Sequence, residues 1–329
     1  MIHNRKSLPT LDDVAILAGV SKSVASRALS GKNRPISKDK KQRVIQAAEE
    51  LGYVANPFAK SLINQETGLI AVVVNHITDL SDLSLFDQLL QAIQSLGKQT
   101  LFIRLKEEKD IDEMRKNAFI HRVDAALIFS DMIEPDVAGT LFLTNNILWL
   151  NGKCCTEGMS VIIDESYAIQ AAVEHAKIQK YEQCYLIGGR QFSLIEQKRI
   201  CHYQRSIDAC GLELKNIVFC NYSYSESEKF FDKEDARKYF NSVIFCTSDS
   251  MAMAAVDFLK KNGYAKSNNV FGFDNTLYSN TYSYQFPTIG YNKNEFIKSI
   301  LSLISPESNY KEQNSKITIE AQFYLNYTK

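Results

Sequence analysis

The sequence predicts an N-terminal all-α unit of the helix-turn-helix type, followed by an α/β domain with parallel sheets in two lobes. Three short stretches within the first 52 residues carry apolar residues at helical spacing. From Gly68 onward, short apolar runs alternate with helical patterns, which is typical of parallel sheets covered on both faces. Residues 68–329 are too many for one such sheet, so two lobes with a cleft between them are expected.

The first helix is predicted from an apolar stripe made of Leu11, Val14, Ala15 and Ala18. Thr10 is a suitable N-cap, Asp12 and Asp13 lie in the first turn, and Gly19 can adopt the left-handed conformation that ends a helix.

A second and a third helix are also predicted, and a tight Gly-Val-Ser turn joins the first helix to the second. Ser21 can cap the second helix, whose inner face is Ala25, Ala28 and Leu29. The third begins near Ser37 and ends at Gly52, and its inner face is Val44, Ala47, Ala48 and Leu51.

The second helix therefore turns polar and basic side chains outward: Lys22, Ser23, Ser26 and Arg27. They lie where a recognition helix meets the major groove of DNA, and Arg27 and Lys22 suit the acceptors of guanine. Phosphate contacts are expected from Ser21, Ser26 and the basic residues of the third helix, which are Lys38, Lys40, Lys41 and Arg43. The alternative is a small helical bundle with a solvated basic face.

The net charge of zero conceals an asymmetry that favours a nucleic-acid partner. Residues 1–64 hold 11 Lys and Arg against 5 Asp and Glu, a net charge of +6, so the remainder carries −6. No signal peptide and no apolar run of membrane-spanning length is present. The seven cysteines are scattered, which fits free thiols in a reducing cytoplasm better than a disulfide framework.

A short segment after the third helix needs a partner to become ordered. Asn56 can cap a helix that starts at Pro57 and exposes Phe58, Leu62 and Ile63. Because one or two turns are unstable alone, the segment must pack on another chain or in a nucleic-acid groove, where Leu62 could enter the minor groove. The alternative is an ordinary linker helix whose Leu62 packs on its own domain.

These N-terminal motifs resemble the LacI/GalR (lactose and galactose repressor) family in order and spacing. The matching residues are Thr10-Leu11-Asp12-Asp13-Val14-Ala15, Ala18-Gly19-Val20-Ser21, Ser26-Arg27, Gly52-Tyr53, and Asn56-Pro57 with Ala59 and Leu62. The resemblance implies a homodimer on a pseudo-palindromic double-stranded DNA operator, with paired hinge helices that insert Leu62 at its centre. It also implies base reading by Lys22, Ser23 and Arg27, and a minor-groove or phosphate contact near Asn56. One departure is Val24-Ala25, where the family usually has Thr-Val, so a threonine–phosphate contact is missing.

The body of the chain is predicted as alternating strands and helices. The expected strands are 69–74, 100–103, 125–129, 147–150, 184–187, 243–246 and 270–273, with helices at 86–96 and 111–121.

No catalytic or cofactor motif accompanies these elements, so we expect neither an enzyme nor a metal or cofactor site. Gly188-Gly189-Arg190 is read as a tight turn after a strand. Asp79 and Asp82 are read as solvated charges in a polar loop, because the glycine and terminal glutamate of a calcium loop are absent. Cys201 and His202 would point apart on a helix and form no nucleophile pair.

The family resemblance extends more weakly over residues 68–329, which look like the periplasmic sugar-binding-protein fold. It implies five effector-binding residues: Phe86, Asn151, Arg199, Ser248 and Asp274. Asn151 and Ser248 stand where the family more often has aspartate and asparagine, and His202 replaces a glycine of the Arg-x-x-Gly segment. A structural role remains the alternative for each residue; Asp249 could be a helix N-cap and Arg199 a surface ion pair.

We therefore expect a DNA-binding domain at 1–56, a hinge helix and linker at 57–67, and an effector-binding and dimerisation domain at 68–329. Its first lobe would comprise about 68–165 and 291–320, and its second about 166–290 and 321–329. The predicted function is a cytoplasmic transcriptional regulator, a repressor by preference, controlled by a sugar or sugar phosphate bound between the lobes. The alternatives are a solute-binding module with an N-terminal protein-interaction domain and an α/β enzyme with an accessory helical domain.

Overall fold

The computed structural model describes residues 9–29, 35–54, 66–77, 79–116, 122–150, 158–264, 268–305 and 315–326 of the 329-residue chain. The chain divides into two compact units, Met1–Gly68 and Leu69–Lys329, and each is considered by itself. None of the helices described is long and apolar enough to cross a membrane. The five cysteines in the described ranges are free thiols.

The first unit contains the three predicted helices, α1 (Leu11–Ala18), α2 (Lys22–Leu29) and α3 (Lys38–Leu51). Val14, Ala25 and Val44, one from each helix, are fully buried at their meeting point. Thr10 caps α1 as predicted: its hydroxyl accepts a hydrogen bond from the Asp13 amide, and its own amide donates to the Asp13 carboxylate. Gly19 and Gly52 end α1 and α3 at φ 63°, in the left-handed region that glycine adopts most easily.

The second unit contains two six-stranded sheets, which confirms the predicted two-lobed α/β fold class. The first sheet has the order β11-β5-β4-β3-β1-β2, and every neighbouring pair is parallel. Its strands are β1 (Leu69–Val74), β2 (Gln99–Arg104), β3 (Ala125–Ile128), β4 (Ile147–Trp149), β5 (Met159–Asp164) and β11 (Lys316–Glu320). Its helices are α5 (Leu80–Ser95), α6 (Glu108–Lys116), α7 (Pro135–Phe142) and α12 (Lys293–Ile304).

The second sheet has the order β12-β10-β9-β8-β6-β7 and is parallel except for β12, which runs antiparallel to β10. Its strands are β6 (Gln183–Gly188), β7 (Glu213–Phe219), β8 (Ser242–Cys246), β9 (Val270–Phe273), β10 (Thr288–Gly290) and β12 (Gln322–Tyr324). Its helices are α8 (Ser166–Ile178), α9 (Leu194–Cys210), α10 (Tyr224–Phe231) and α11 (Asp249–Lys261), with short 3-10 turns at Ala236–Tyr239 and Leu277–Ser279.

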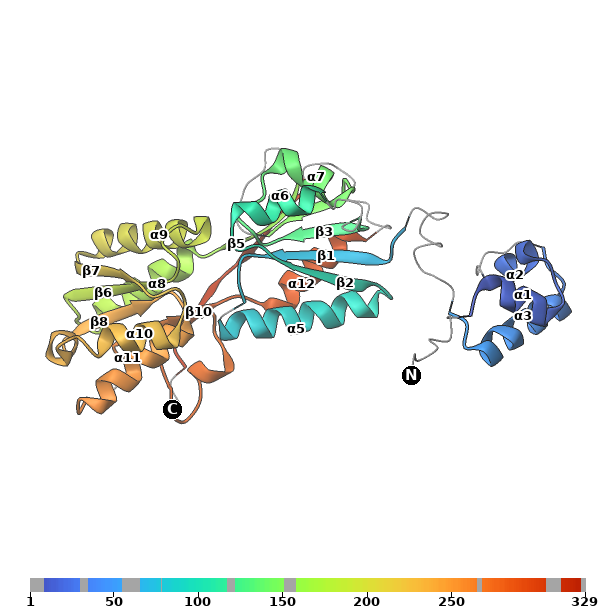
Figure 1. The fold of residues 1–329 in the computed structure, drawn as a ribbon. Coiled ribbons are helices and arrows are strands. Elements are labelled where there is room, and N and C mark those ends of the chain that lie inside the picture. Colours follow the sequence, from blue (N-terminus) through green and yellow to red (C-terminus); the bar gives the residue numbers. More distant parts are fainter. Residues whose placement is uncertain are drawn as a thin grey trace, which may run out of the picture. The chain divides into compact units, whose positions relative to one another are not determined.

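Helices cover both faces of each sheet because successive strand residues point to opposite sides. Val72 and Val74 of β1 pack in the cluster that contains α5 and α12, whereas Ala71 and Val73 pack in the cluster that contains α6 and α7. Figure 1 shows α5 and α12 on one face of the first sheet, and α8 and α9 opposite α10 and α11 on the second. The chain passes between the sheets three times, after β5, after β10 and between β11 and β12.

The start of α5 corrects one prediction. The helix begins at Leu80, six residues before the predicted start, because Asp79 caps it and forms a capping box with Asp82. Asp79 is only 5% exposed, so these two aspartates are not solvated loop charges. The polar first turn of α5 hid its helical period from the sequence pattern. The helix predicted at 111–121 begins at Glu108, and residues 117–121 lie outside the described ranges.

Candidate functional site

The first unit presents an exposed polar face on α2. Ser21, Lys22 and Ser23 are exposed, and Ser26 and Arg27 are partly buried. Ala25 and Ala28 lie on the opposite side of the helix, in the core. The structure therefore places the five predicted residues along one short helix, with Ser21, Lys22 and Ser23 at its N-terminal end and Arg27 in its last turn.

Lys22, Ser21, Ser23 and Arg27 take part in local, solvent-exposed contacts. Lys22 Nζ lies 2.7 Å from Asp12 Oδ2, and both side chains are more than half exposed. Arg27 Nε donates to the Ser23 carbonyl at 3.2 Å, and the hydroxyls of Ser21 and Ser23 are 3.0 Å apart. Exposed ion pairs of this kind contribute at most about 1 kcal/mol, so the side chains can exchange them for contacts to a polyanion.

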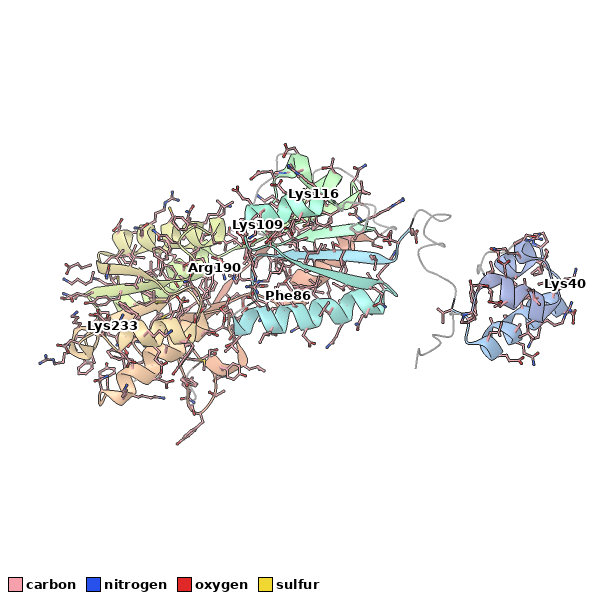
Figure 2. All side chains as sticks on the ribbon, viewed as in Figure 1. Lys40, Phe86, Lys109, Lys116, Arg190 and Lys233 are labelled. Atoms are coloured by element: carbon pink, nitrogen blue, oxygen red, sulfur yellow. The ribbon has the colours of Figure 1, made fainter. Side chains whose placement is uncertain are left out.

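The basic residues predicted to face phosphates divide into two groups. Lys38, Lys40 and Lys41 are exposed on α3, and Figure 2 shows Lys40 at the surface of the unit. Arg43 instead donates from Nη1 to the Ala18 carbonyl at 3.3 Å, which joins α3 to the end of α1, and it pairs with Asp39. The predicted DNA contacts Asn56 and Leu62 lie outside the described residues.

The second unit contains a cavity of about 470 Å³ lined by residues from both sheets. Its walls come from the segments that follow the carboxyl ends of β1, β3, β5 and β9, together with α5 and α9. This is the position at which open parallel sheets bind their ligands. Figure 2 shows Phe86 and Arg190 in the region between the two sheets.

Aromatic rings form part of the wall on both sides of the cavity. Phe86 of α5 is 7% exposed and packs edge to face on Phe102 and Phe129, with both ring centroids 5.3 Å away. Tyr222, in the turn before α10, lies parallel to the ring of His76 from the other lobe, at 5.9 Å between centroids. Burial, with the charges of Arg190 and Arg104, lowers the pKa of His76 to about 4, so this ring is neutral at pH 7.

Arg199 of α9 lies in the wall and is held by groups of the protein itself. Its Nε and Nη2 donate to the two carboxylate oxygens of Glu165 at 2.8 and 2.5 Å, and Nη1 donates to the Thr247 carbonyl at 3.0 Å. The guanidinium also stacks 3.7 Å over the ring of Phe273. Burial opposes the charge, but Glu165 with Tyr222 and Glu196 outweighs it and holds the pKa of Arg199 well above its usual value.

Glu196 of α9 connects Tyr222 of the cavity wall to Gly189 and Thr247. It is fully buried and accepts hydrogen bonds from the Gly189 amide, the Thr247 hydroxyl and the Tyr222 hydroxyl, each at 2.7 Å. Burial raises the pKa of Glu196, although Arg199 at 3.7 Å acts in the opposite direction. Gly189 is required here, since a Cβ atom at this position would lie 1.9 Å from the Tyr222 ring.

Three aspartates meet between the lobes. Asp274 lines the cavity, while Asp249 lies behind it, fully buried, and accepts from the Thr276 amide at 2.7 Å and the Thr288 hydroxyl at 2.6 Å. Asp79 accepts from the Ser250 hydroxyl at 2.6 Å, a hydrogen bond between lobes. Burial raises the pKa of Asp249 to about 7, and burial together with Asp79 holds that of Asp274 well above its usual value.

The structure thus brings Phe86, Arg199 and Asp274 to one cavity. Ser248 is fully buried, accepts from the Met251 amide as the N-cap of α11, and does not line the cavity. Asn151 lies outside the described residues.

Sequence reasoning missed three residues of the cavity: Tyr222, Glu165 and Asp79. Tyr222 follows β7, a strand of mixed polarity that carries no apolar run, and Glu165 follows β5, whose apolar run is only three residues long. A search for polar or aromatic residues just after each strand could have found Tyr222 and Glu165 only if both strands had been predicted, whereas Asp79 was noticed but taken for a loop charge.

The chain is similar to bacterial regulatory proteins in both sequence and fold. Residues 10–56 match the family model described as bacterial regulatory proteins, lacI family. The chain is 22% identical to catabolite control protein A of Priestia megaterium, over 82% of this chain and 83% of that protein. It is 24% identical to the HTH-type transcriptional regulator GalR of Escherichia coli (strain K12), over 86% and 84%.

A search of solved structures agrees over nearly the whole chain. The structure of a lac repressor dimer bound to operator and the anti-inducer ONPF matches with a TM-score of 0.83 at 18% identity, covering 96% of this chain and 98% of that one. At this identity the match establishes the fold alone.

Proposed function

The chain belongs to the LacI family of bacterial regulatory proteins, and from this premise we propose that it is a DNA-binding transcriptional regulator, a repressor by preference, controlled by a small-molecule effector. Its operator would be a pseudo-palindromic duplex bound by a homodimer in the cytoplasm, as the lac repressor dimer binds its operator in the structure compared above. The DNA-binding domain would comprise 1–56, the hinge and linker 57–67, and the effector and dimerisation domain 68–329.

The observation that carries this proposal is the outward-facing polar and basic side of α2. A helix of eight residues cannot be stable alone, and here Ala25 and Ala28 fix it on α1 and α3 so that Ser21, Lys22, Ser23 and Arg27 remain on its outer side. Side chains of this kind suit major-groove readout, with Arg27 on guanine and Lys22 on guanine or phosphate. The exposed lysines of α3 suit the phosphates on either side of the groove.

The effector would bind in the cavity between the lobes. Hydrogen bonds such as that between Asp79 and Ser250 close the lobes on each other, and a ligand that binds one degree of closure better than another shifts the equilibrium between them. The proposed hinge, with Leu62 at the operator centre, would transmit this shift because short helices need their partner and the DNA to fold.

The salt dependence of DNA binding tests this assignment directly. The affinity of the full-length protein for a duplex selected from a random library should fall steeply with salt, because each neutralised phosphate releases counterions. The Lys40→Ala substitution should weaken binding to all sequences alike and lower the slope of log affinity against log salt by about one.

Lys233→Ala is the matched control, since Lys233 is an exposed lysine of the second unit. It should leave the slope unchanged. Equal slopes for wild type and Lys40→Ala would contradict the proposed phosphate contact, and a protein with no salt-dependent affinity for DNA would contradict the proposed function.

A further inference from the structure

We propose that Arg190, Arg104 and His76 form a binding site for a phosphate group where the two lobes meet. The phosphate would belong to a phosphorylated small molecule or would be a free inorganic phosphate ion. Such a site goes beyond the proposed function, because a phosphate can bind there whether or not the chain binds DNA.

The three side chains come from the carboxyl ends of strands in both sheets. Arg104 is the last residue of β2, and His76 lies two residues after the neighbouring strand β1. Arg190 lies two residues after β6, in the other lobe. Tyr222 connects the lobes here, because its ring stacks on His76 at 5.9 Å and packs against Gly189, the residue before Arg190. Figure 2 shows Arg190 in the region between the two sheets.

The guanidinium of Arg190 is partly buried without an anion in contact. Its Nε atom is buried and has no hydrogen-bond partner among the described residues. Burial, together with the charge of Arg104, lowers the pKa of Arg190, although Tyr222, Asp82 and Glu226 act in the opposite direction. Arginine keeps its proton at pH 7 even so. Its charge therefore stays in place, and a bound anion is what can compensate it.

The two nearby carboxylates are engaged elsewhere. Asp82 belongs to the capping box of α5 and accepts from the Asp79 amide at 3.4 Å. Glu226 is exposed and accepts from the Asn221 side chain at 2.8 Å. Among the described residues, neither carboxylate forms an ion pair with Arg190, so both act on it only through space.

His76 adds a second nitrogen without a partner. Its Nδ1 atom is buried, and no described residue forms a hydrogen bond with it. Burial, then the charges of Arg190 and Arg104, lowers the pKa of His76 to about 4, so the ring is neutral at pH 7 and can donate one N–H to an anion. Arg104 is exposed and takes part in no ion pair of the described residues. Because His76 and Arg190 lie on different lobes, a small change in lobe closure gives a ligand access to both.

A pocket of about 700 Å³ begins beside Arg190 and gives a phosphate room. Tyr222 lines both this pocket and the cavity described above. The hydroxyls of Ser223 and Ser225, 3.1 Å apart, lie in its wall. Among the described residues that line the pocket, Glu226 is the single acid, whereas six acids line the cavity. An anion is therefore less opposed here than in the cavity.

A phosphate suits this cluster better than a neutral ligand or a carboxylate. The planar fork of arginine donates to two phosphate oxygens at once. A phosphate dianion compensates both arginines, whereas a carboxylate compensates one and a neutral sugar neither. Since Arg104 and Arg190 lie on different lobes and repel each other, a bound phosphate would favour closure of the lobes.

Titration of the full-length chain with inorganic phosphate at pH 8 and constant ionic strength tests the proposal. The line width of the phosphorus NMR signal reports binding. We expect saturable binding, and Arg190→Gln should weaken it at least about tenfold, because a charge-assisted hydrogen bond is worth at least this factor. Arg104→Gln, at an exposed residue, should weaken it by about threefold.

Controls separate this site from other basic surfaces and from loss of folding. Lys40→Ala in the basic first unit and Arg205→Gln at an exposed arginine of α9 should leave phosphate binding unchanged. Arg190→Lys keeps the charge and should bind phosphate more tightly than Arg190→Gln. The circular dichroism spectrum and urea midpoint of each variant establish that it is folded.

Two further compounds distinguish the sources of the phosphate group. Tighter binding of glucose 6-phosphate than of glucose and of inorganic phosphate would indicate a phosphorylated small molecule, and an affinity no higher than that of inorganic phosphate would indicate the free ion. The proposal is overturned by an absence of saturable phosphate binding, by equal affinity in wild type and Arg190→Gln, or by a loss of binding in Lys40→Ala alone.

These failures differ from a failure of the proposed function. If the protein binds its selected duplex and a neutral ligand alters that binding while phosphate does not bind, the regulator stands and the phosphate site does not. If phosphate binds through Arg190 but the protein binds no DNA, the site stands and the regulator fails.

Discussion

Replacing Arg199 with methionine should lower the free energy of unfolding by about 3–5 kcal/mol, the usual cost of removing one partner of a buried ion pair. Methionine keeps most of the apolar stem against Phe273 but removes both bonds to Glu165 and the bond to Thr247. Glu165, whose side chain is 11% exposed, and Glu196, which is fully buried, are then left without their cation. Most of the cost is therefore electrostatic.

The loss should depend on pH in a way that a packing defect would not. Burial already raises the folded-state pKa of Glu196 above its ordinary value of 4.5, and Arg199 opposes that rise. Without Arg199 the folded-state pKa rises further, so the folded variant holds a proton that the unfolded chain releases. Its stability therefore decreases as pH rises from the unfolded pKa to the new folded pKa, and the deficit against wild type should be smaller near pH 5 than near pH 8.

Urea denaturation of the full-length chain at both pH values measures this deficit. Circular dichroism reports the helices, and the fluorescence of Trp149, the single tryptophan and 3% exposed, reports the first sheet. Arg205→Met, at an exposed residue of the same helix, is the control and should change stability by less than about 0.5 kcal/mol. A deficit below about 1 kcal/mol for Arg199→Met, or one of equal size at both pH values, would refute the electrostatic reasoning.

Three further substitutions test other parts of the molecule. Thr10→Ala removes the capping box of α1 and should destabilise the first unit by about 1 kcal/mol in thermal melts followed by circular dichroism; an unchanged melt would show that the cap contributes nothing. Gly189→Ala places a Cβ atom 1.9 Å from Tyr222 and should cost about 1–3 kcal/mol in urea denaturation, whereas Gly139→Ala, whose Cβ atom has no neighbour closer than 3.5 Å, should cost nothing; equal effects would contradict the close approach at Tyr222. Leu62→Ala should weaken operator binding and leave effector binding intact, and equal operator affinity in a gel shift would contradict the hinge mechanism.

The sequence predicts best the elements that local chemistry determines. Val14, Ala15 and Ala18 form a stripe of helical period between a threonine cap and a glycine stop, and α1 has these ends in the structure. The buried strand β1 is a continuous apolar run and was predicted at its observed bounds. By contrast, β7 has only partly buried and exposed residues, so no apolar run or strict alternation revealed it.

The cavity depends on contacts between residues far apart in the sequence. Arg199 meets Glu165 across 34 positions and Thr247 across 48, and neither partner has a local pattern that would reveal it. The family resemblance pointed to Arg199 and Asp274, and both line the cavity, but it did not predict that Glu165 engages the guanidinium. The partners of Arg199 can therefore be identified only from the three-dimensional fold, which brings these distant residues together.

Selection of bound sequences from a random duplex library by the full-length protein tests the central claim, that α2 reads DNA sequence. The wild-type protein should enrich two half-sites related by a two-fold axis, and Arg27→Ala should lose the preference at one base pair of each half-site while keeping the others. Enrichment of no sequence by the wild type, or an identical motif from Arg27→Ala, would contradict the account.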